Sequence, residues 1–440
     1  MKNKLISFCV FILMSTYSFS QGSWKLIDSI SAPTSAYGID VSFVNDSVGY
    51  FADYLSNRIY RTTNKGESWS NISSIGGTLR SLEFVNDTIG FLGCLSSSGV
   101  NPGAMFRTVN GGVTWTQLTN MQMGLYDGIC GIEKFGNTVI ATGTYSGPSW
   151  FYRSDDFGNS WTRSDLSAIS SGLIDCYMYS SDTILITGVS NSTNGYRANI
   201  LKSTDGGVSW QQVFVASKPS TTVWKIFMRP SGKGIASIQS YLTDTLKAAI
   251  TNDFGDTWQE VNVAPPDPNW MAGVCFLNDT LGWISTEYNG PTFETQDGGF
   301  TWNPISLVNG VNRFVALDSA TVIGPGSAAG YMAVVYKYDG NSSVGIPEIN
   351  TVKTDDGNSL AIFPNPAINS ISIEVTSIEN TVGILRVVDI KGNVVMNLTK
   401  QFFTKGTSKL NQKLDLPAGH YYLLLLSNNS NIAKPFEVTR

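Results

Sequence analysis

The sequence is poor in histidine and in charge. Its only histidine, His420, lies near the C-terminal end of 440 residues. A Ser-His-Asp triad or a histidine-ligated metal is therefore excluded from the first 419 residues. Charged residues make up 14% of the chain, the formal net charge is -5, and Lys and Arg form no cluster. Because nucleic acids and acidic lipids are bound by clustered cations, we expect neither as a partner.

Long apolar runs are also missing. No segment after Met14 approaches the ~20 apolar residues that cross a membrane, so we predict no transmembrane segment. At the N-terminus, two lysines precede a short apolar run that ends at Met14, and Ser18 and Ser20 follow. This order is typical of a secretory signal peptide, which we predict for residues 1–20. An uncleaved membrane anchor is the alternative, and the shortness of the run argues against it.

Paired cysteines are the third absence. Cys9 falls in the predicted signal peptide, and the other four are irregularly spaced, without any Cys-x-x-Cys pair: Cys94, Cys130, Cys176 and Cys275. This spacing does not indicate a metal site, and no other motif calls for a cofactor. Each of the four lies in an apolar, strand-like stretch. The sequence therefore predicts four small buried side chains, with one disulfide as the alternative in an oxidising compartment.

What the sequence does contain is a repeat. Six segments, here called boxes, share the pattern Ser/Thr-x-Asp/Asn-x-Gly-x-Ser/Thr-Trp, and their tryptophans lie 44 to 49 residues apart. In such a turn the Asp or Asn oxygen accepts backbone N–H bonds, and the glycine adopts the positive φ that a side chain would oppose. The Trp then begins a strand, where it buries a large apolar area. The predicted structural residues are Asn64, Gly66, Trp69, Asn110, Gly112, Trp115, Asp156, Gly158, Trp161, Asp205, Gly207, Trp210, Asp253, Gly255, Trp258, Asp297, Gly299 and Trp302.

A second signature divides each repeat into strands. An aromatic residue, a polar turn and a glycine precede an apolar stretch, as in residues 84–91 and 276–283. Each unit therefore predicts four short strands, and a period of this length indicates a propeller. Trp24, 45 residues before Trp69, begins the same kind of strand but has no box. We predict an all-β fold, a seven-bladed β-propeller over residues 21–340 whose N-terminal strand completes the last blade.

The boxes resemble the Asp-box repeats of sialidases, sortilin-type receptors, oligoxyloglucan hydrolases and photosystem II stability/assembly factors. The box from Thr295 to Trp302 matches the Thr-x-Asp-Gly-Gly-x-Thr-Trp pattern of the last group at every position. The resemblance covers about residues 22 to 340 and implies the propeller fold. It implies no function, because a fold does not carry a site.

The C-terminal stretch resembles a different family, the type A sorting domains of the type IX secretion system. An aromatic-Pro-Asn-Pro opening, a central strand and turn, and a closing Leu-x-x-Gly-x-Tyr element occur in the family's order: Pro364, Asn365, Pro366, Asp389, Gly392, Gly419 and Tyr421. The resemblance implies a small β-sandwich over residues 359–440. It also implies the type IX secretion machinery as a partner, and a protein that is secreted or attached to the cell surface. Residues 341–358, rich in Ser, Gly, Asp and Asn, are predicted to be a linker.

The residues support an enzyme less well than a binding protein. A sialidase would need an arginine triad, a Tyr/Glu pair and an Asp acid. Arg61, Arg107 and Arg153 instead occupy one register before their boxes, which indicates a structural position, and the Arg-Ile-Pro opening of sialidases is absent. We assign no catalytic residue. Another glycoside hydrolase, using two of the 34 acidic residues, is the alternative.

Two other interpretations concern the turns. Calcium binding at a loop such as Asp205 to Gly207 is disfavoured, because each box has one such acidic position and calcium takes six or more oxygens. Asp-Ser/Thr-apolar tripeptides recur, as in residues 87–89, and resemble an acceptor for protein O-glycosylation. A hairpin turn rich in Asp and Thr explains the same register equally well.

The sequence therefore predicts a binding or scaffold protein. It would hold an unidentified protein or glycan with loops at one face of the ring and with the central channel. Trp150, Trp224 and Trp270 lie in loop-like segments and are candidates for stacking on sugars, with packing between blades as the alternative. A hydrolase would show two carboxylates ~5 to 10 Å apart in a deep polar pocket on the axis, whereas an aromatic-lined face would favour binding.

Overall fold

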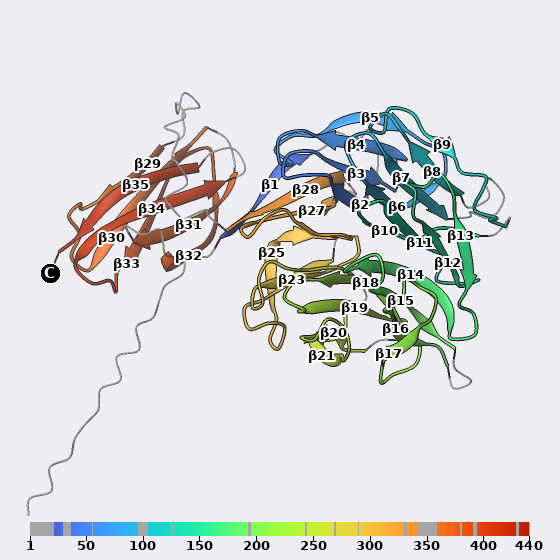
Figure 1. The fold of residues 1–440 in the computed structure, drawn as a ribbon. Coiled ribbons are helices and arrows are strands. Elements are labelled where there is room, and N and C mark those ends of the chain that lie inside the picture. Colours follow the sequence, from blue (N-terminus) through green and yellow to red (C-terminus); the bar gives the residue numbers. More distant parts are fainter. Residues whose placement is uncertain are drawn as a thin grey trace, which may run out of the picture. The chain divides into compact units, whose positions relative to one another are not determined.

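The computed structural model consists of strands joined by turns (Figure 1), and no helix occurs in the part of the chain that it describes. Two compact units are formed, Trp24–Asp339 and a unit that includes Gly340–Arg440. The predicted signal peptide, the predicted linker and Gly392 lie outside the described residues. The structure describes residues 22–29, 37–54, 56–95, 104–124, 127–191, 195–242, 244–267, 270–288, 290–328, 332–340, 359–378, 381–389, 394–427 and 431–439.

The first unit is built from seven four-stranded sheets. The first strand of each sheet lies innermost, and the first strands of consecutive sheets contact one another. These strands are β2 (Gly38–Phe43), β6 (Thr78–Phe84), β10 (Gly131–Phe135), β14 (Ser170–Met178), β18 (Thr221–Met228), β22 (Met271–Phe276) and β26 (Val315–Ala316). The second strands are β3 (Gly49–Asp53), β7 (Gly90–Leu95), β11 (Thr138–Thr142), β15 (Ile184–Ser190), β19 (Gly234–Ser240), β23 (Gly282–Thr286) and β27 (Thr321–Ala328).

The remaining two strands of each sheet lie further from the centre (Figure 1). The third strands are β4 (Arg58–Thr62), β8 (Ala104–Thr108), β12 (Trp150–Ser154), β16 (Arg197–Ser203), β20 (Leu246–Thr251), β24 (Pro291–Thr295) and β28 (Met332–Asp339). The outermost strands are β5 (Ser70–Ser74), β9 (Thr116–Gln117), β13 (Thr162–Asp165), β17 (Gln211–Val215), β21 (Gln259–Ala264), β25 (Asn303–Asn309) and, in the last sheet, β1 (Ser23–Ser29).

The ring closes on itself because β2 contacts β27 of the last sheet, and because β1 is hydrogen-bonded to β28. The predicted all-β propeller and the predicted completion of its last sheet by the N-terminal strand are therefore confirmed. Trp24 on β1 packs edge-on against Trp283, with ring centroids 5.1 Å apart, and lies 5.6 Å from the ring of Tyr338. This aromatic contact joins β1 to residues of the sixth and seventh sheets.

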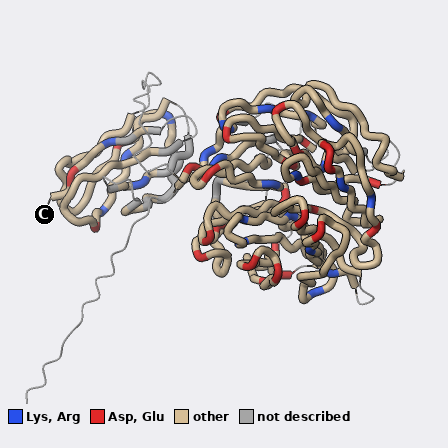
Figure 2. The backbone as a smooth tube through the Cα atoms, viewed as in Figure 1, with Lys and Arg blue, Asp and Glu red and all other residues tan. Residues whose placement is uncertain are grey.

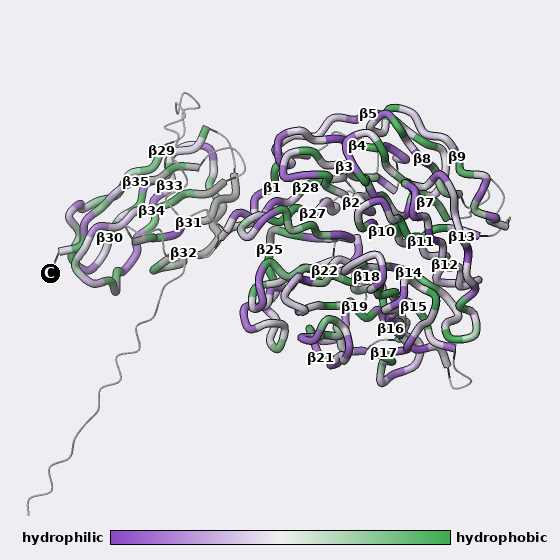
Figure 3. Tube along the Cα trace, in the orientation of Figure 1, coloured by the Kyte–Doolittle hydropathy of each residue, from purple (hydrophilic) through white to green (hydrophobic). Residues whose placement is uncertain are grey.

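Burial follows the sequence pattern. Every residue of β3, β11 and β22 is buried, because these strands are apolar on both faces and lie between neighbouring sheets. The polar outermost strand β13 is exposed at every residue. Figure 3 shows hydrophobic and hydrophilic positions interspersed along the strands. Cys94, Cys130, Cys176 and Cys275 are buried and unpaired, in agreement with the prediction of four small buried side chains.

The glycine of each box forms a joint between sheets. Gly158 has φ 77°, and a Cβ at this position would come within 2.4 Å of the ring of Phe91 in the preceding sheet. Gly299 has φ 96°, and its Cβ would come within 2.2 Å of Ile250. Only glycine therefore meets both demands at these turns, the positive φ and the close approach.

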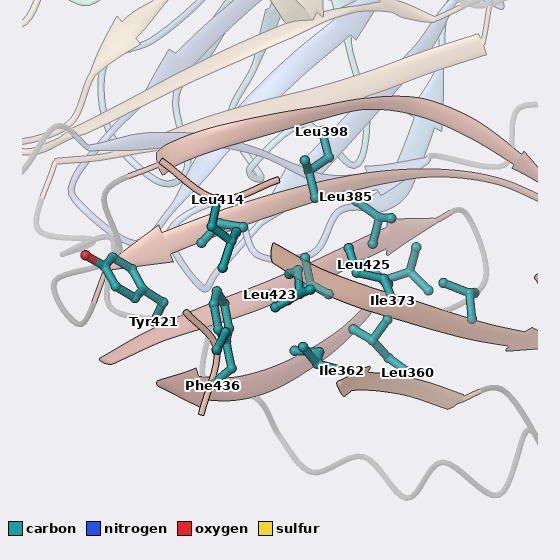
Figure 4. Close-up of a cluster of buried hydrophobic side chains, with 14 of the residues drawn as sticks. Leu360, Ile362, Ile373, Leu385, Leu398, Leu414, Tyr421, Leu423, Leu425 and Phe436 are labelled. Atoms are coloured by element: carbon teal, nitrogen blue, oxygen red, sulfur yellow. The ribbon is translucent and has the colours of Figure 1, made fainter. Parts of the chain in front are cut away.

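The C-terminal unit is a two-sheet β-sandwich. One sheet has the order β29 (Ser359–Phe363), β30 (Ser370–Ser377) and β33 (Gly406–Lys413), and the other β32 (Val394–Phe403), β31 (Thr381–Asp389), β34 (Gly419–Ser427) and β35 (Asn431–Val438). Alternate residues of β30 are buried, as expected for a strand with one face on a core. Figure 4 shows Ile373, Leu385, Leu423, Leu425 and Phe436 from the two sheets packed into that core.

Candidate functional site

Bulges in the innermost strands bring polar side chains to the axis of the propeller. The pairing register shifts once in each of β2, β6, β18 and β22 and twice in β14. A bulge bends its strand and turns a side chain away from the face that it would otherwise occupy. The charged or aromatic residues at or beside these bulges are Asp40, Arg80, Asp175, Trp224 and Lys225.

Arg313, just before β26, crosses the axis. Its Nη2 lies 2.6 Å from Asp175 Oδ1 and its Nη1 3.1 Å from Asp175 Oδ2, while its Nε lies 2.9 Å from Asp40 Oδ1. These residues belong to the seventh, fourth and first sheets, which can meet only at the centre of the ring. Burial alone would raise the pKa of Asp175, but the charges of Arg313 and Lys225 hold this pKa below its usual value. The ion triad therefore closes the middle of the channel, and Figure 2 shows charged positions of both signs in the propeller.

Lys225 lies beside this triad and is 1% exposed. Burial, followed by repulsion from Arg313, lowers the pKa of Lys225 to about 8, although Asp175 and Asp40 oppose the shift. Among the described residues, no carboxylate forms an ion pair with its Nζ, since both aspartates are taken by Arg313. Lys225 is therefore a second axial cation whose charge is only partly compensated.

An aromatic cluster lies at the end of the channel where the first strands begin and the second strands end. These strands are antiparallel, so Gly38 pairs with Asp53 and Met271 with Thr286, and both pairs mark this end. We call this end the mouth. The boxes follow the third strands and lie at the opposite end of the sheets. The aromatic residues of the mouth are Tyr37, Tyr145, Trp224, Tyr241, Trp270 and Tyr288.

The rings of the mouth contact one another in pairs. Centroids are 5.2 Å apart for Tyr37 and Tyr288, 6.0 Å for Tyr145 and Trp224, and 5.5 Å for Tyr241 and Trp270. Four of the rings belong to side chains that are 43–48% exposed: Tyr145, Tyr241, Trp270 and Tyr288. Exposure of a large aromatic side chain to water is unfavourable, and a cluster of exposed rings therefore indicates a contact surface for a ligand.

Arg80 lies beneath these rings. Its guanidinium carbon lies 4.1 Å from the ring centroid of Trp224, and the side chain is only 6% exposed. Its Nε and Nη2 are buried and have no hydrogen-bond partner among the described residues. Nearby Glu287 is also buried, and burial raises the pKa of Glu287, an effect that the charge of Arg80 partly offsets. The mouth thus combines exposed rings with a buried cation, two of whose guanidinium nitrogens have no hydrogen-bond partner among the described residues.

A carboxyl pair lies towards the other end of the innermost strands. Glu83 on β6 forms an ion pair with Lys134 at 2.8 Å and accepts a hydrogen bond from Ser42 Oγ at 3.1 Å. Burial, followed by the charge of Glu83, raises the pKa of the neighbouring Glu133 to about 8.

The six boxes satisfy their own polar atoms. The first hydroxyl accepts a hydrogen bond from the box glycine at 2.8–3.1 Å, as Ser203 does from Gly207. The Asp or Asn Oδ1 accepts one from the backbone four residues on, at 2.8–3.0 Å. Each box Trp donates its Nε1–H to the glycine carbonyl at 2.9–3.2 Å. Hydrogen bonds led by those from Ser160, Ser209 and Thr301 lower the pKa of Asp156, Asp205 and Asp297 to about 2.

The hairpin turns between first and second strands are satisfied in a similar way. Asn86 Oδ1 accepts hydrogen bonds from Thr88 N at 3.0 Å, Thr88 Oγ1 at 2.9 Å and Ile89 N at 2.8 Å. Asn278 does the same for Thr280 and Leu281. The Asp-Thr-apolar register thus has a structural role in the turn, and O-glycosylation at these residues stays a prediction.

The sorting-motif residues lie in the C-terminal sandwich. Asn365 lies between Pro364 and Pro366 and contacts β35 twice: it accepts a hydrogen bond from Glu437 N at 2.9 Å and donates one to Pro435 O at 3.3 Å. Gly419 begins β34, where the hydroxyl of Tyr421 donates to Pro417 O at 2.8 Å, and Asp389 ends β31. The two hydrogen bonds of Asn365 join the start of the domain to its last strand.

Two of the three tryptophans proposed for ligand stacking are not in loops. Trp150 is the first residue of β12, where the guanidinium of Arg163 lies 4.0 Å from its ring, and Trp224 is a buried residue of β18. The prediction of loops was wrong for both residues, because the apolar strand β12 begins at Trp150 and the apolar strand β18 continues through Trp224. Only Trp270, 46% exposed just before β22, has the predicted setting. Arg61, Arg107 and Arg153 lie on third strands, as their register predicted.

Comparison with known proteins identifies the C-terminal unit. Residues 361–438 match the family model described as a secretion system C-terminal sorting domain. The protein is therefore exported through the type IX secretion system to the cell surface or the extracellular space. No curated protein matches the chain. No helix in the described residues is long and apolar enough to span a bilayer.

Solved structures resemble the propeller. The structure of YCF48 bound to a D1 peptide has a TM-score of 0.51 and 15% identity, covering 73% of this chain and 98% of that chain. YCF48 from Cyanidioschyzon merolae has a TM-score of 0.52 and 17% sequence identity, and the match covers 72% of this chain and 98% of that chain. The GH74 xyloglucanase from Xanthomonas campestris has a TM-score of 0.52 and 12% sequence identity, and the match covers 81% of this chain and 60% of that chain. At these identities the likeness establishes the β-propeller and leaves the ligand open.

Proposed function

We propose that this protein is an extracellular binding module whose propeller takes a glycan at the mouth of its channel. In this proposal residues 1–20 are a signal peptide, residues 21–340 bind the ligand, residues 341–358 link the two units, and residues 359–440 serve export. The sorting-domain match supports delivery outside the cell. A ligand site on loops at one end of a rigid ring is the usual arrangement in propellers.

The observation that carries the proposal is the cluster of exposed rings at the mouth. Tyr145, Tyr241, Trp270 and Tyr288 come from the third, fifth and sixth sheets, and each is nearly half exposed. Rings that served only to pack neighbouring sheets would be buried, as Trp283 and Phe276 are. Exposed aromatic faces stack on the apolar faces of sugar rings, and Tyr hydroxyls bond to sugar hydroxyls.

A binding assay on a panel of soluble polysaccharides tests this proposal. The mature full-length chain and a Trp270→Ala/Tyr241→Ala variant would be compared by affinity electrophoresis or calorimetry. Phe300→Ala is the matched control, because Phe300 is an exposed aromatic residue (59%) in a box, at the other end of the sheets. We expect at least one polysaccharide to bind the wild type and the control equally and the mouth variant at least about tenfold more weakly. Retention of full affinity by the mouth variant would refute the site.

A glycoside hydrolase is a second candidate, supported by Glu83 and Glu133. Glycoside hydrolysis needs a carboxyl with a raised pKa as general acid and a second carboxyl nearby, and Glu133 has such a raised pKa beside Glu83. The test is release of reducing ends from the same panel by the wild type and by Glu133→Gln. Turnover that disappears in the variant would establish the enzyme, whereas binding without turnover would leave the binding module alone.

A further inference from the structure

The mouth holds an arginine whose charge is not compensated. Arg80 forms no ion pair among the described residues, and two of its three guanidinium nitrogens, Nε and Nη2, are buried without a hydrogen-bond partner. A buried donor without a partner costs about 1–3 kcal/mol, more if it is charged. Its neighbour Cys130 is no counter-ion, because burial raises the pKa of that thiol and keeps it neutral. Arg80 stacks on Trp224 and forms a hydrogen bond with the neutral Cys130 thiol, and neither contact supplies a full negative charge.

The other arginine of the axis shows what compensation looks like. Arg313 meets Asp175 with both terminal nitrogens and Asp40 with Nε. Both aspartates also accept backbone hydrogen bonds, Asp40 from Leu82 N at 3.0 Å and Asp175 from Ile226 N at 3.0 Å. They have little capacity left for a second cation. Arg80 and Lys225 therefore depend on something else for an anion.

Two carboxyls of the mouth are engaged elsewhere or compensate Arg80 poorly. Asp53 accepts hydrogen bonds from Tyr37 N at 2.9 Å and from Ser56 Oγ, and Glu287 forms only a weak contact of its own. The Oε1 of Glu287 accepts a hydrogen bond from Gln239 at 3.4 Å, and no ion pair with Arg80 is formed. Burial raises the pKa of Glu287, so that ionisation of this carboxyl is disfavoured. Among the described residues, neither Arg80 nor Lys225 thus forms an ion pair with a carboxylate, and an added carboxylate would supply one.

On this basis, and resting on the proposed function, we propose that the mouth binds a carboxylate-bearing saccharide of the uronate type. Arg80 receives the carboxylate with its free donors, and the exposed rings receive the sugar faces. A planar guanidinium forms two parallel hydrogen bonds to a carboxylate, which gives this ligand its orientation. Binding lowers the cost of the buried charge that the free protein carries.

The backbone of the mouth favours a saccharide over a peptide. Extended peptides are recognised mainly by main-chain pairing with a free strand edge. Here the nearby backbone groups bond to one another: Tyr54 N to Tyr37 O at 2.9 Å, Glu287 N to Trp270 O at 2.7 Å and Tyr241 N to Ser220 O at 2.9 Å. Side chains are therefore the main recognition groups left, and rings with one cation suit an acidic sugar chain.

Calorimetry of the mature full-length chain with defined oligosaccharides tests the inference. Oligogalacturonate is compared with its methyl ester, which has the same sugar rings without the charge, and with a glutamate-rich peptide of similar charge. We expect the acid to bind at least about tenfold more tightly than the ester. Above the pKa of Lys225, about 8, this preference should decrease, because one of the two mouth cations loses its charge. Equal affinity for acid and ester, or preferential binding of the peptide, would overturn the proposal.

Variants separate the inference from the proposed function. Arg80→Gln should lose most of the preference for the acid over the ester, with only the contribution of Lys225 left, whereas Arg163→Gln, which removes an arginine stacked on Trp150, should leave the preference unchanged. If Arg80→Gln does not fold, Arg80→Lys keeps the charge without the planar fork and should weaken acid binding while a preference persists. Binding of neutral glycans alone, dependent on Trp270, would support the binding module and refute the acidic ligand. Failure of every glycan to bind would refute both.

Discussion

The boxes and the mouth lie at opposite ends of the same sheets, and they differ in how far their polar atoms are hydrogen-bonded. In a box, the hydroxyl, the carboxylate or amide, the glycine carbonyl and the indole N–H are all hydrogen-bonded within eight residues, as in residues 203–210. At the mouth, Arg80 is buried with unused donors and Trp270 is left half exposed. A segment that satisfies itself stabilises the fold, whereas one that does not is available for a ligand.

Trp24, which occupies the box-Trp position of the last sheet, differs from the six box tryptophans in the same way. Trp24 on β1 has no box, and its buried Nε1 has no hydrogen-bond partner among the described residues. It is held instead by the rings of Trp283, Phe314 and Tyr338. Six sheets are thus fastened by a local turn, and the last by aromatic packing and strand pairing between distant segments.

The largest expected effect comes from breaking a box. Trp69→Ala should reduce the free energy of unfolding by about 3–5 kcal/mol, because Trp69 is buried against Phe51 and Phe43 and loses its bond to Gly66 O. Urea unfolding followed by tryptophan fluorescence measures this. All eleven tryptophans lie at or before residue 302, so the signal reports the propeller alone. A loss below about 1 kcal/mol would contradict the structural role of the box.

Next in size is the axial triad. Asp175→Asn should destabilise the propeller by about 3 kcal/mol, since the fully buried Asp175 supplies one of the two counter-charges of Arg313, whose side chain is 17% exposed. Asp155→Asn is the matched control: Asp155 also binds an arginine, Arg153, at 2.7 Å, but its side chain is 60% exposed. An exposed pair of this kind contributes about 0–1 kcal/mol. Equal losses in the two variants would show that the axis is not closed by the triad.

Lowering the pH should reduce the stability that the box aspartates contribute to the propeller. The folded-state pKa of Asp156, Asp205 and Asp297 is about 2, below the unfolded value. Their contribution to stability is therefore present above about pH 4 and is lost as the pH falls towards 2. Asn64 and Asn110 perform the same turn without titrating. Asp205→Asn should thus keep its stability at pH 7 and show a smaller loss between pH 4 and 2, and an unchanged acid profile would contradict this assignment.

The smallest stability effect is expected at the mouth. Trp270→Ala should change the free energy of unfolding by less than about 0.5 kcal/mol, because the side chain is 46% exposed and contacts Tyr241 at the surface. The same variant should weaken ligand binding, as described above. A large destabilisation by Trp270→Ala would make the mouth part of the scaffold and remove the contrast with the boxes.

The sequence predicts the scaffold well because its signals are local. Each box brings its turn, its glycine and its Trp within eight residues, and the spacing of the boxes gives the sheets and their number. The pairing of β1 with β28 could also be predicted, because Trp24 lies one repeat before Trp69 without a box of its own. The Pro-Asn-Pro segment led to the sorting domain in the same way.

The channel could not be predicted in this way. Arg80, Asp175, Trp224, Lys225 and Arg313 carry no shared motif, and each lies in a stretch that reads as an ordinary strand or turn. The sequence around Trp224 predicts a loop, whereas Trp224 is part of the bulge in β18. A clue was present: charged residues interrupt otherwise apolar innermost strands, as Asp175 does in β14.

The amino-acid sequence by itself determined the repeat, the turn that ends each third strand and the export domain, because each of these depends on residues that are neighbours in the chain. Only the tertiary structure decided which side chains meet on the axis. Arg313 and Asp40 are 273 residues apart, and ring closure places them 2.9 Å from each other. Whether a buried charge is balanced or left open, as for Arg313 and Arg80, depends on partners from distant sheets, and no local pattern records it.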